Sequence, residues 1–472
     1  MSPDEFRRHA HAMVDWMADY LADVGTRRVV PDVRPGDVRR RLPGAAPEAG
    51  EPFERLFADF RDVIVPGMTH WNHPGWFAYF PANASPPSIL AEMLVSTLGA
   101  QCMSWQTSPA ATELEQVAMQ WLRDLLGLDA GFTGVIQDTS STATLVALLT
   151  ARERATAHAT GAVGLRDAGA PALTVYASTE AHSSVPKGVK LAGYGLEQLR
   201  LIGVDDAYAM RPDLLERALA DDAAAGRRPA CVVATLGTTS STAVDPLRPI
   251  GDLCRRYGAW LHVDASYAGA AGLLPECRWM FDGMELADSF VMNPHKWLLV
   301  NFDCSAYFVR DVDATLRTFQ TSPEYLRTAY DPEVANFRDW GVQLGRRFRA
   351  LKLWFVLRSY GAEGLRTMLR AHIALAAEFR RRVEAEPDFE VVAPSPLGLV
   401  CFRHRPAGMD HPAALDEHNR ALLAEVNRDG SVHLTHTSLG GHYVLRLAVG
   451  QWQTGREDVE RAWSLIRRAS AY

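Results

Sequence analysis

The sequence of 472 residues contains few cysteines, no long apolar run and no excess of positive charge. Its six cysteines are widely spaced and form no CxxC pair. This spacing argues against a disulfide framework or a zinc site, and it favours buried thiols in a reducing compartment. The six are Cys102, Cys231, Cys254, Cys277, Cys304 and Cys401.

Other absences bear on location and partners. No apolar stretch is long enough to span a bilayer, and the first residues lack the charged start and apolar core of a signal peptide. The formal net charge of -7 gives no electrostatic reason to expect a nucleic-acid partner. We therefore expect a cytoplasmic protein with neither a membrane nor a nucleic-acid partner.

A chain of this length is expected to divide into two or three domains. Residues 1–85 predict a helical arm, because Ser2 and Glu5 form a capping box before a helix with one apolar face. A Pro- and Gly-rich connector follows over residues 29–52, which leaves this helix little of its own chain to pack on. We expect it to pack against another subunit, with packing on its own chain as the alternative.

The middle and the end of the chain differ in pattern. Residues 86–360 alternate short apolar strands with helices, which predicts a large α/β domain with a mostly parallel, doubly covered sheet. Residues 361–472 predict a small α+β domain with helices near Ala413–Val426 and Arg456–Ser470. Strands are expected at Thr133–Ile136, Leu173–Ser178, Gln198–Ile202, Ala230–Thr235, Trp260–Ala265, Ser289–Met292, Ser305–Val309, Phe389–Val392, Leu399–Arg403, Val432–Thr437 and Tyr443–Ala448.

One lysine and one carboxylate follow two of these strands. Lys296 lies in the run Asn-Pro-His-Lys-Trp. Asp264 lies at the end of an earlier strand, and the two residues are separated by about one strand-helix-strand unit, so neighbouring strand ends can carry both groups. A pyridoxal phosphate (PLP) enzyme needs a lysine that forms a Schiff base and a carboxylate that pairs with the pyridine nitrogen. The pattern therefore predicts PLP as cofactor. For each residue alone, a surface lysine and a turn-capping aspartate are the simpler alternatives.

Hydroxyl residues and a histidine follow two other strands. Thr139, Ser140 and Ser141 precede the helix expected over Ala143–Arg152, where free backbone N–H groups suit a phosphate. Capping of that helix explains the same residues without a ligand. His182 can stack on a planar cofactor and donate a proton, although a lone histidine is more often structural.

The segment Thr318–Phe337 has little apolar periodicity. It contains Tyr325 and two prolines, Pro323 and Pro332. Long irregular segments inside compact domains often act as lids, so we expect either a functional lid or a plain surface loop.

Together these features resemble the group II PLP-dependent decarboxylases, specifically the aromatic-L-amino-acid decarboxylases, over essentially the whole chain. The most specific motif is the run Asn293–Trp297. The resemblance implies the fold of the aspartate aminotransferase type (fold type I) and a homodimer whose active sites lie at the subunit interface. The other matching motifs are Thr69–Trp71, Phe77–Pro81, Ser108–Glu115, Ala181–Ser184, Leu236–Thr239, Asn293–Ser305 and Leu344–Phe348.

The resemblance also implies a role for each site residue. Lys296 would form the Schiff base, Asp264 would pair with the pyridine nitrogen, and His182 would stack on the ring. Tyr325, with His182, would return a proton to Cα after CO2 has left. The other implied cofactor-binding residues are Thr139, Ser140, Ser141, Thr239, Ser266, Asn293 and His295. The implied substrate-binding residues are Trp71, Tyr79, Phe80, Pro81, Ala82, Gln101, Met103 and Gly345, and no metal is implied.

Five positions depart from the pattern of the animal members. Ala82 stands where a hydroxyl residue is common, and Gln101 and Met103 replace bulkier apolar residues that the partner subunit would contribute. Ser266 replaces an alanine under the cofactor, and Asp138 replaces a glycine before the phosphate loop. None of these changes removes a catalytic group, but those at Ala82, Gln101 and Met103 leave open which aromatic substrate is preferred.

The leading interpretation is decarboxylation of tryptophan, phenylalanine, tyrosine or 3,4-dihydroxyphenylalanine to the amine and CO2. The closest alternative is an aromatic aldehyde synthase, which also deaminates oxidatively, and Tyr325 argues against it because that branch often carries phenylalanine. Gly345 and the aromatic pocket argue against histidine and glutamate decarboxylases, and the motif around Lys296 argues against a transaminase. A non-catalytic PLP-binding protein would lack Lys296 or Asp264, and both are present.

Overall fold

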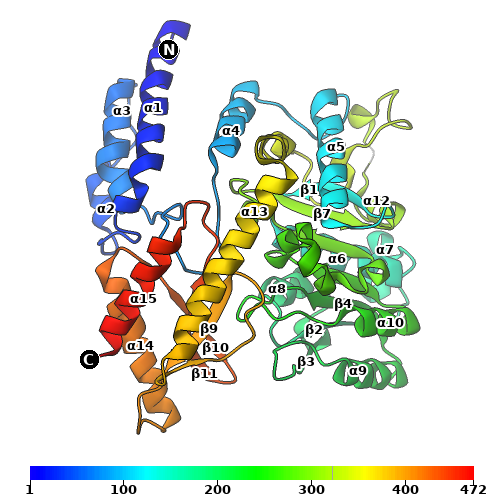
Figure 1. Cartoon of the computed structure of the whole chain (residues 1–472). Coiled ribbons are helices and arrows are strands. Elements are labelled where there is room, and N and C mark those ends of the chain that lie inside the picture. Colours follow the sequence, from blue (N-terminus) through cyan, green and yellow to red (C-terminus); the bar gives the residue numbers. More distant parts are fainter. Residues whose placement is uncertain (322, 472) are drawn as a thin grey trace. The chain divides into compact units, whose positions relative to one another are not determined.

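The computed structural model describes residues 1–321 and 323–471, and the chain divides into two compact units (Figure 1). The first comprises residues 1–81, 381–390 and 402–472, and the second comprises residues 82–380 and 391–401. Within the described ranges no helix is both long enough and apolar enough to cross a membrane.

Among the described residues, the sheet of the second unit has seven strands in the order β1-β7-β6-β5-β4-β2-β3. β7 runs antiparallel to both of its neighbours, and the pairs from β6 to β3 are parallel. This confirms the predicted mostly parallel sheet. The strands are β1 Thr133–Gln137, β2 Leu173–Ser178, β3 Leu199–Ile202, β4 Arg228–Thr235, β5 Trp260–Asp264, β6 Ser289–Met292 and β7 Ser305–Val309.

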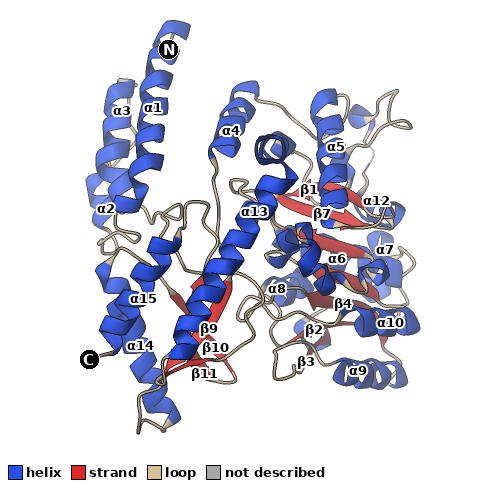
Figure 2. Cartoon of the chain, viewed as in Figure 1, coloured by secondary structure: helices blue, strands red, loops and turns tan. Residues whose placement is uncertain are grey.

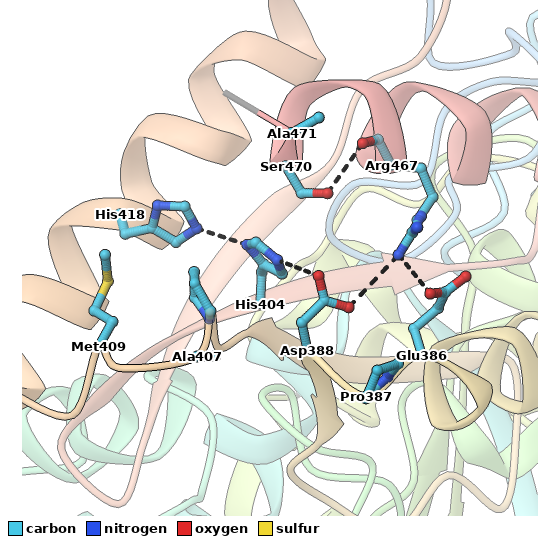
Figure 3. Close-up of a pocket in the computed structure, with 11 residues that line it drawn as sticks. Glu386, Pro387, Asp388, His404, Ala407, Met409, His418, Arg467, Ser470 and Ala471 are labelled. Carbon is cyan, nitrogen blue, oxygen red and sulfur yellow. Dashed lines mark hydrogen bonds and ion pairs between the residues drawn. The ribbon is translucent and has the colours of Figure 1, made fainter.

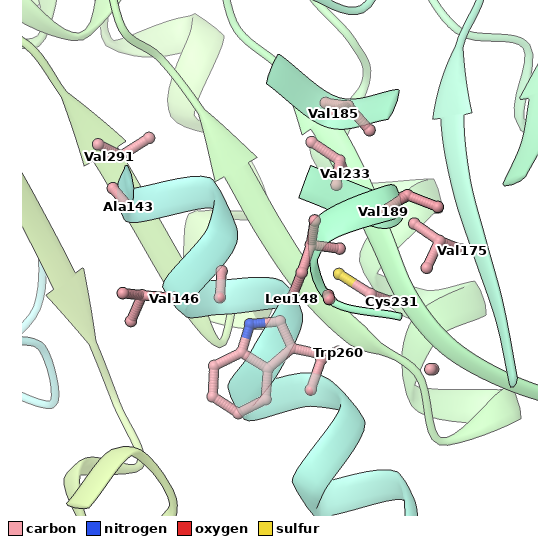
Figure 4. Packing of buried hydrophobic residues seen from close by; sticks show 14 of the residues in the cluster. Ala143, Val146, Leu148, Val175, Val185, Val189, Cys231, Val233, Trp260 and Val291 are labelled. Atoms are coloured by element: carbon pink, nitrogen blue, oxygen red, sulfur yellow. The ribbon is translucent and has the colours of Figure 1, made fainter. Parts of the chain in front are cut away.

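The central strands are apolar and buried because helices cover both faces of the sheet. Val146 of α6 and Val185 of α8 belong to one cluster with Val175 and Val233 of the strands (Figure 4). Each fully buried side chain of this size stabilises the fold by about 2 kcal/mol. The helices α9 and α10 also contact β4.

Prolines and glycines set many helix ends in the second unit. Pro109 opens α5, and Gly127 closes it with a left-handed φ of 73° that a side chain would resist. The helices are α4 Pro86–Leu98, α5 Pro109–Leu126, α6 Ser140–Ala155, α7 Thr160–Asp167, α8 Ser184–Leu191, α9 Pro212–Ala224, α10 Leu247–Tyr257, α11 Pro294–Trp297, α12 Val312–Phe319 and α13 Arg349–Ala385.

A second sheet, in the order β10-β11-β9-β8, lies near the C-terminus of the chain, where α14 contacts β11 and α15 (Figure 2). Its strands are β8 Phe389–Val391, β9 Leu399–His404, β10 Thr435–Leu439 and β11 His442–Ala448. The helices of the first unit are α1 Pro3–Asp23, α2 Asp37–Arg41, α3 Phe53–Asp59, α14 Pro412–Asp429 and α15 Arg456–Ser470.

The first helix has the predicted start and an apolar face that its own chain covers only in part. Ser2 and Glu5 form the capping box. The Tyr20 hydroxyl on this face lies 2.8 Å from His70 Nδ1. Phe6 nevertheless remains 60% exposed. Part of the predicted face therefore packs within the chain, and part is exposed.

The first unit also contains a polar cleft of about 660 Å³ (Figure 3). His404 Nδ1 lies 2.7 Å from His418 Nε2, and His404 Nε2 lies 3.0 Å from Asp388 Oδ2. Arg467 pairs with Glu386 at 2.6 Å and with Asp388 at 3.5 Å. These contacts connect the end of β9 with α14 and α15.

The predicted strands of the large domain are confirmed, and their ends shift by at most two residues. One strand near the C-terminus was placed too early, because β10 begins at Thr435 and not at Val432. The preceding residues pair elsewhere: His433 forms a parallel bridge with Trp76. A pairing between distant segments cannot be seen in a local pattern of apolar residues.

A buried ion pair connects α5 to the segment before α13. Arg346 contacts both carboxylate oxygens of Glu115, at 3.2 and 2.7 Å, and also donates to the Ile136 carbonyl at 2.6 Å. The two side chains are only 6% and 3% exposed. Removal of one partner would leave a charge that is buried and unpaired.

We expect Glu115→Ala to lower the free energy of unfolding by about 3–5 kcal/mol, because the Arg346 guanidinium loses its counter-charge in a buried site. Urea unfolding followed by tryptophan fluorescence measures the loss. The control is Asp213→Ala, which removes an exposed pair with Arg211 at 2.6 Å and should cost far less, because solvent screens that pair. Equal losses in the two variants would contradict the structural role of the buried pair.

Candidate active site

The residues assigned to the cofactor gather at one edge of the seven-stranded sheet. β1, β2, β4, β5 and β6 run in the same direction, so their carboxyl ends share this edge, where α/β proteins bind ligands. β7 runs the other way and begins there, because Ser305 pairs with Gln137. The residues brought to this edge are Thr139 after β1, His182 after β2, Thr239 after β4, Asp264 at the end of β5 and Asn293 after β6.

Lys296 lies on α11, directly after β6, in a turn that is held at two points. Asn83 Nδ2 donates to the Lys296 carbonyl at 2.8 Å, and the Trp297 indole donates to His372 Nδ1 at 3.0 Å. Burial lowers the pKa of the Lys296 amine, and the nearby Asp264 carboxylate opposes that shift. The amine and the carboxylate are therefore close enough to affect each other.

Asp264 is only 4% exposed. Ser266 donates to its Oδ1 twice, through the backbone N–H at 3.0 Å and through the hydroxyl. These two donors fix the orientation of the carboxylate. Burial lowers the pKa of His182, and Asp264 opposes that shift as it does for Lys296, so these three of the four residues predicted to be catalytic interact electrostatically.

The first turn of α6 forms the candidate anion site. Thr139 caps the helix, and its hydroxyl accepts from the Thr142 N–H at 3.4 Å. Ser140 and Ser141 occupy the first turn, where backbone N–H groups have no acceptor within a helix. Ser140 is buried and Ser141 is exposed.

Asp138 places a carboxylate directly before this turn. Its Oδ1 accepts from the Thr139 N–H at 2.6 Å, and its Oδ2 accepts from Gln343 Nε2 at 2.8 Å. Burial raises the pKa of Asp138, but hydrogen bonds from Thr142, Gln343 and Thr139 outweigh burial and lower it. The carboxylate is therefore ionised and held in place at neutral pH.

A chain of short contacts joins Asn293 to Asp264. Ser140 and Ser305 each donate to Asn293 Oδ1 at 2.6 Å. The Ser140 hydroxyl lies 2.7 Å from the Ser266 hydroxyl, which contacts Asp264. The hydroxyls occupy the oxygen end of the Asn293 amide, so its NH2 group points to the opposite side as a donor.

The two site histidines are neutral, and both use Nδ1 as an acceptor. His182, which is exposed, accepts from the Ser184 N–H at 3.1 Å, and His295 accepts from the Cys304 N–H at 2.9 Å. Loss of hydration lowers the pKa of both, and that of His295 falls to about 3 with Lys296 as the second cause. Each imidazole therefore carries its hydrogen on Nε2.

Four of the predicted substrate-binding residues lie in the first unit. Trp71 stacks on Tyr79 with ring centroids 5.7 Å apart, and both side chains are exposed. Phe80 is buried beneath Arg446, whose guanidinium lies 5.3 Å from its ring centroid. Pro81 is also buried. Trp71 and Tyr79 therefore form an exposed aromatic pair, and the substrate-binding role of all four residues stays a prediction.

The other four predicted substrate-binding residues belong to the second unit. Gln101 Oε1 accepts from the Arg346 N–H at 2.7 Å, and a Cβ on Gly345 would lie 3.2 Å from Gln101 Nε2. Gln101 and Gly345 are therefore neighbours. Met103 is half-buried, and its carbonyl accepts from the Arg338 N–H at 2.9 Å. Ala82 is half-buried at the start of the unit.

Two predicted residues are exposed at the surface. Tyr325 lies on a short 3-10 helix in the otherwise irregular segment after α12, and its side chain is 78% exposed. Thr239 is exposed in the turn after β4. The roles assigned to Tyr325 and Thr239 stay predictions.

Sequence reasoning missed several residues that position the site. Asn83 and His372 hold the turn around Lys296, Gln343 holds Asp138, and Ser305 holds Asn293. A signal existed for Asn83 and Ser305, because both adjoin or end motifs that carry the resemblance. Gln343 directly precedes the motif Leu344–Phe348, whereas nothing local marks His372, whose partner is distant in sequence.

The residues at this edge fit PLP. A lysine with a lowered pKa, a fixed carboxylate and a helix N-terminus beside a donor amide match the aldehyde, the pyridine nitrogen and the phosphate. In the part of the chain that the structure describes, no group of three or more His, Cys, Asp or Glu side chains is arranged to hold a metal ion.

Comparison with known proteins agrees with this geometry. The family model described as the pyridoxal-dependent decarboxylase conserved domain matches residues 35–405. The chain is 44% identical to the aromatic-L-amino-acid decarboxylase of Bos taurus and 42% identical to the phenylacetaldehyde synthase of Arabidopsis thaliana. Each alignment covers 100% of this chain and 97% of the relative.

Solved structures show the same likeness. The structure of Oryza sativa TDC with PLP and tryptamine superposes with a TM-score of 0.96 at 39% identity, covering 100% of this chain and 98% of that one. The predicted fold type is thereby confirmed. The chain belongs to the pyridoxal-dependent decarboxylase family, and it is a carboxy-lyase that uses PLP.

Proposed function

We propose that this protein decarboxylates an aromatic L-amino acid, with tryptophan among its good substrates, to the corresponding amine and CO2. The observation that carries the proposal is the convergence of Lys296, Asp264 and the α6 N-terminus on one sheet edge. A screen of the purified protein for amine, aldehyde and peroxide products from every aromatic amino acid tests it.

The proposed mechanism assigns a task to each group at the edge. PLP, when bound, supplies an electron sink for the electrons of the Cα–carboxylate bond. Burial lowers the pKa of Lys296, which favours the uncharged amine that a Schiff base requires. Asp264 would keep the pyridine nitrogen protonated, and the first turn of α6 with Asn293 and His295 would hold the phosphate through N–H donors.

The chain must then return a proton to Cα. His182 carries its hydrogen on Nε2 because Nδ1 accepts from the Ser184 N–H, so it can stabilise or relay a proton on one face of the ring. Tyr325 is the proposed donor, and its exposed segment would have to close over the site to reach it. Closure would also exclude water and oxygen.

An aromatic aldehyde synthase is the second candidate, because the chain is 42% identical to a phenylacetaldehyde synthase. In that reaction dioxygen takes two electrons and two protons and becomes hydrogen peroxide, and water then releases the aldehyde and ammonia beside CO2. The hydroxyl of Tyr325 favours the decarboxylase, since it supplies the proton that ends the reaction at the amine.

We propose a cytoplasmic homodimer as the working form. The cysteines are all buried thiols, as a reducing compartment permits. Phe6 on α1 and Leu90, Leu94 and Leu98 on α4 are between 46% and 64% exposed. Exposed apolar residues on two helices of one chain support a subunit interface.

Borohydride reduction of the purified, PLP-loaded protein should attach the cofactor irreversibly to the peptide that contains Lys296. The reason is that Lys296 combines a lowered pKa with the neighbouring Asp264 carboxylate. Peptide mapping by mass spectrometry locates the label, and Lys296→Ala serves as the unlabelled control. Labelling of a different lysine would refute the assignment.

Gly345→Ser should lower kcat/KM for tryptophan by about tenfold and that for tyrosine by less, because added bulk meets Gln101 at 3.2 Å and narrows the pocket for the larger ring. Steady-state kinetics with both substrates measure the change. Gly345→Ala separates bulk from the hydroxyl. A parent enzyme that strongly prefers tyrosine, with a preference that Gly345→Ser leaves unchanged, would overturn this specificity role.

Tyr325→Phe should still release CO2, but amine should fall and aldehyde with peroxide should rise. Phenylalanine keeps the ring but has no proton to give, so the variant separates the acid role from the packing of the segment. Product analysis with parallel oxygen and peroxide assays measures the ratio. Unchanged amine yield without peroxide would move the acid role to another group, and His182→Asn would then be the variant to compare.

A further inference from the structure

We propose that Ser266 and Ser140 form a hydrogen-bonded relay that couples Asp264 at one end of the cofactor site to Asn293 at the other. The inference rests on the proposed function, which assigns Asp264 to the pyridine nitrogen and Asn293 to the phosphate. Both serines are positioning residues, because they act through the groups at the two ends.

The relay is continuous and largely buried. The Ser266 hydroxyl contacts Asp264 Oδ1 and lies 2.7 Å from the Ser140 hydroxyl, which lies 2.6 Å from Asn293 Oδ1. Asp264, Ser140 and Asn293 are buried, and Ser266 is half-buried. Ser305 also donates to Asn293 Oδ1 at 2.6 Å, but it lies on a branch and not on the path to Asp264.

The hydroxyls hold too few hydrogens to make every contact at once. Each serine hydroxyl donates one hydrogen, whereas the relay and its branch contain four oxygen–oxygen contacts. With Ser305 donating to Asn293, two hydrogens remain for three contacts. When Ser140 donates to Asn293, Ser266 has one hydrogen to share between Ser140 and Asp264. The two ends of the site therefore compete for the same hydrogens.

This competition determines whether phosphate at one end strengthens or weakens binding of the ring at the other. A phosphate that accepts from the Asn293 NH2 group polarises the amide and makes its Oδ1 a stronger acceptor. Oδ1 then draws the Ser140 hydrogen, and the Ser140 oxygen draws the hydrogen of Ser266. The Asp264 carboxylate loses part of this donor and attracts a protonated pyridine nitrogen more strongly. Phosphate at one end thus strengthens ring binding at the other.

The experiment measures this coupling without an amino acid substrate. The full-length chain, freed of cofactor, is titrated with pyridoxal, which lacks the phosphate, in the absence and presence of saturating inorganic phosphate. Quenching of tryptophan fluorescence gives the dissociation constants. Phosphate should tighten pyridoxal binding at least about fivefold in the parent chain.

Ser266→Ala and Ser140→Ala interrupt the relay at two different points. Each should lower the coupling factor by about threefold or more, whatever it does to the affinity for pyridoxal alone. Circular dichroism verifies that the variants are folded. The two serines lie on separate segments of the chain. A loss of coupling in both variants therefore cannot come from a packing defect at only one of these positions.

Ser305→Ala is the matched control, since it removes an equally short hydrogen bond to Asn293 without interrupting the relay. The coupling should persist in it. Undiminished coupling in Ser266→Ala, or an equal loss in Ser305→Ala, would overturn the relay. A parent chain that shows the coupling but decarboxylates no aromatic amino acid would refute the proposed function and leave the relay standing.

Discussion

The active-site region depends on one constraint, which is that an amine and a carboxylate must stay close together where water is largely excluded. Burial alone lowers the pKa of Lys296, and Asp264 opposes this shift. A buried ammonium without a counter-charge would be costly, so the carboxylate must be held as firmly as the amine. Ser266 holds Asp264, and Asn83 holds the Lys296 carbonyl.

The parallel sheet makes this arrangement possible. Strands that run in one direction bring their carboxyl ends to the same edge, so residues far apart in sequence become neighbours. The antiparallel strand β7 adds the start of a strand to that edge and brings Ser305 to Asn293. The N-terminus of α6 and the hydroxyl chain also lie at this edge. It can therefore bind an anion at the helix N-terminus and a cation at the Asp264 carboxylate.

Hydrogen-bond direction decides what the histidines can do. Backbone N–H groups occupy Nδ1 of His182 and His295, so both rings are neutral donors through Nε2. Loss of hydration reinforces this state by lowering the pKa of each ring. A neutral His295 can donate to a phosphate, and a neutral His182 adds no positive charge beside Lys296.

The sequence by itself determined the fold type, nearly all strand positions and the identity of the cofactor. Apolar periodicity, helix caps and the motif around Lys296 are local, and each constrains the backbone within a few residues. Only the tertiary structure decided which groups hold those residues in place. Asn83, His372 and Gln343 act across long stretches of chain, and the hydroxyl chain through Ser266 exists only once strand ends meet. Such contacts depend on the register and direction of distant strands, which no local pattern of residues encodes.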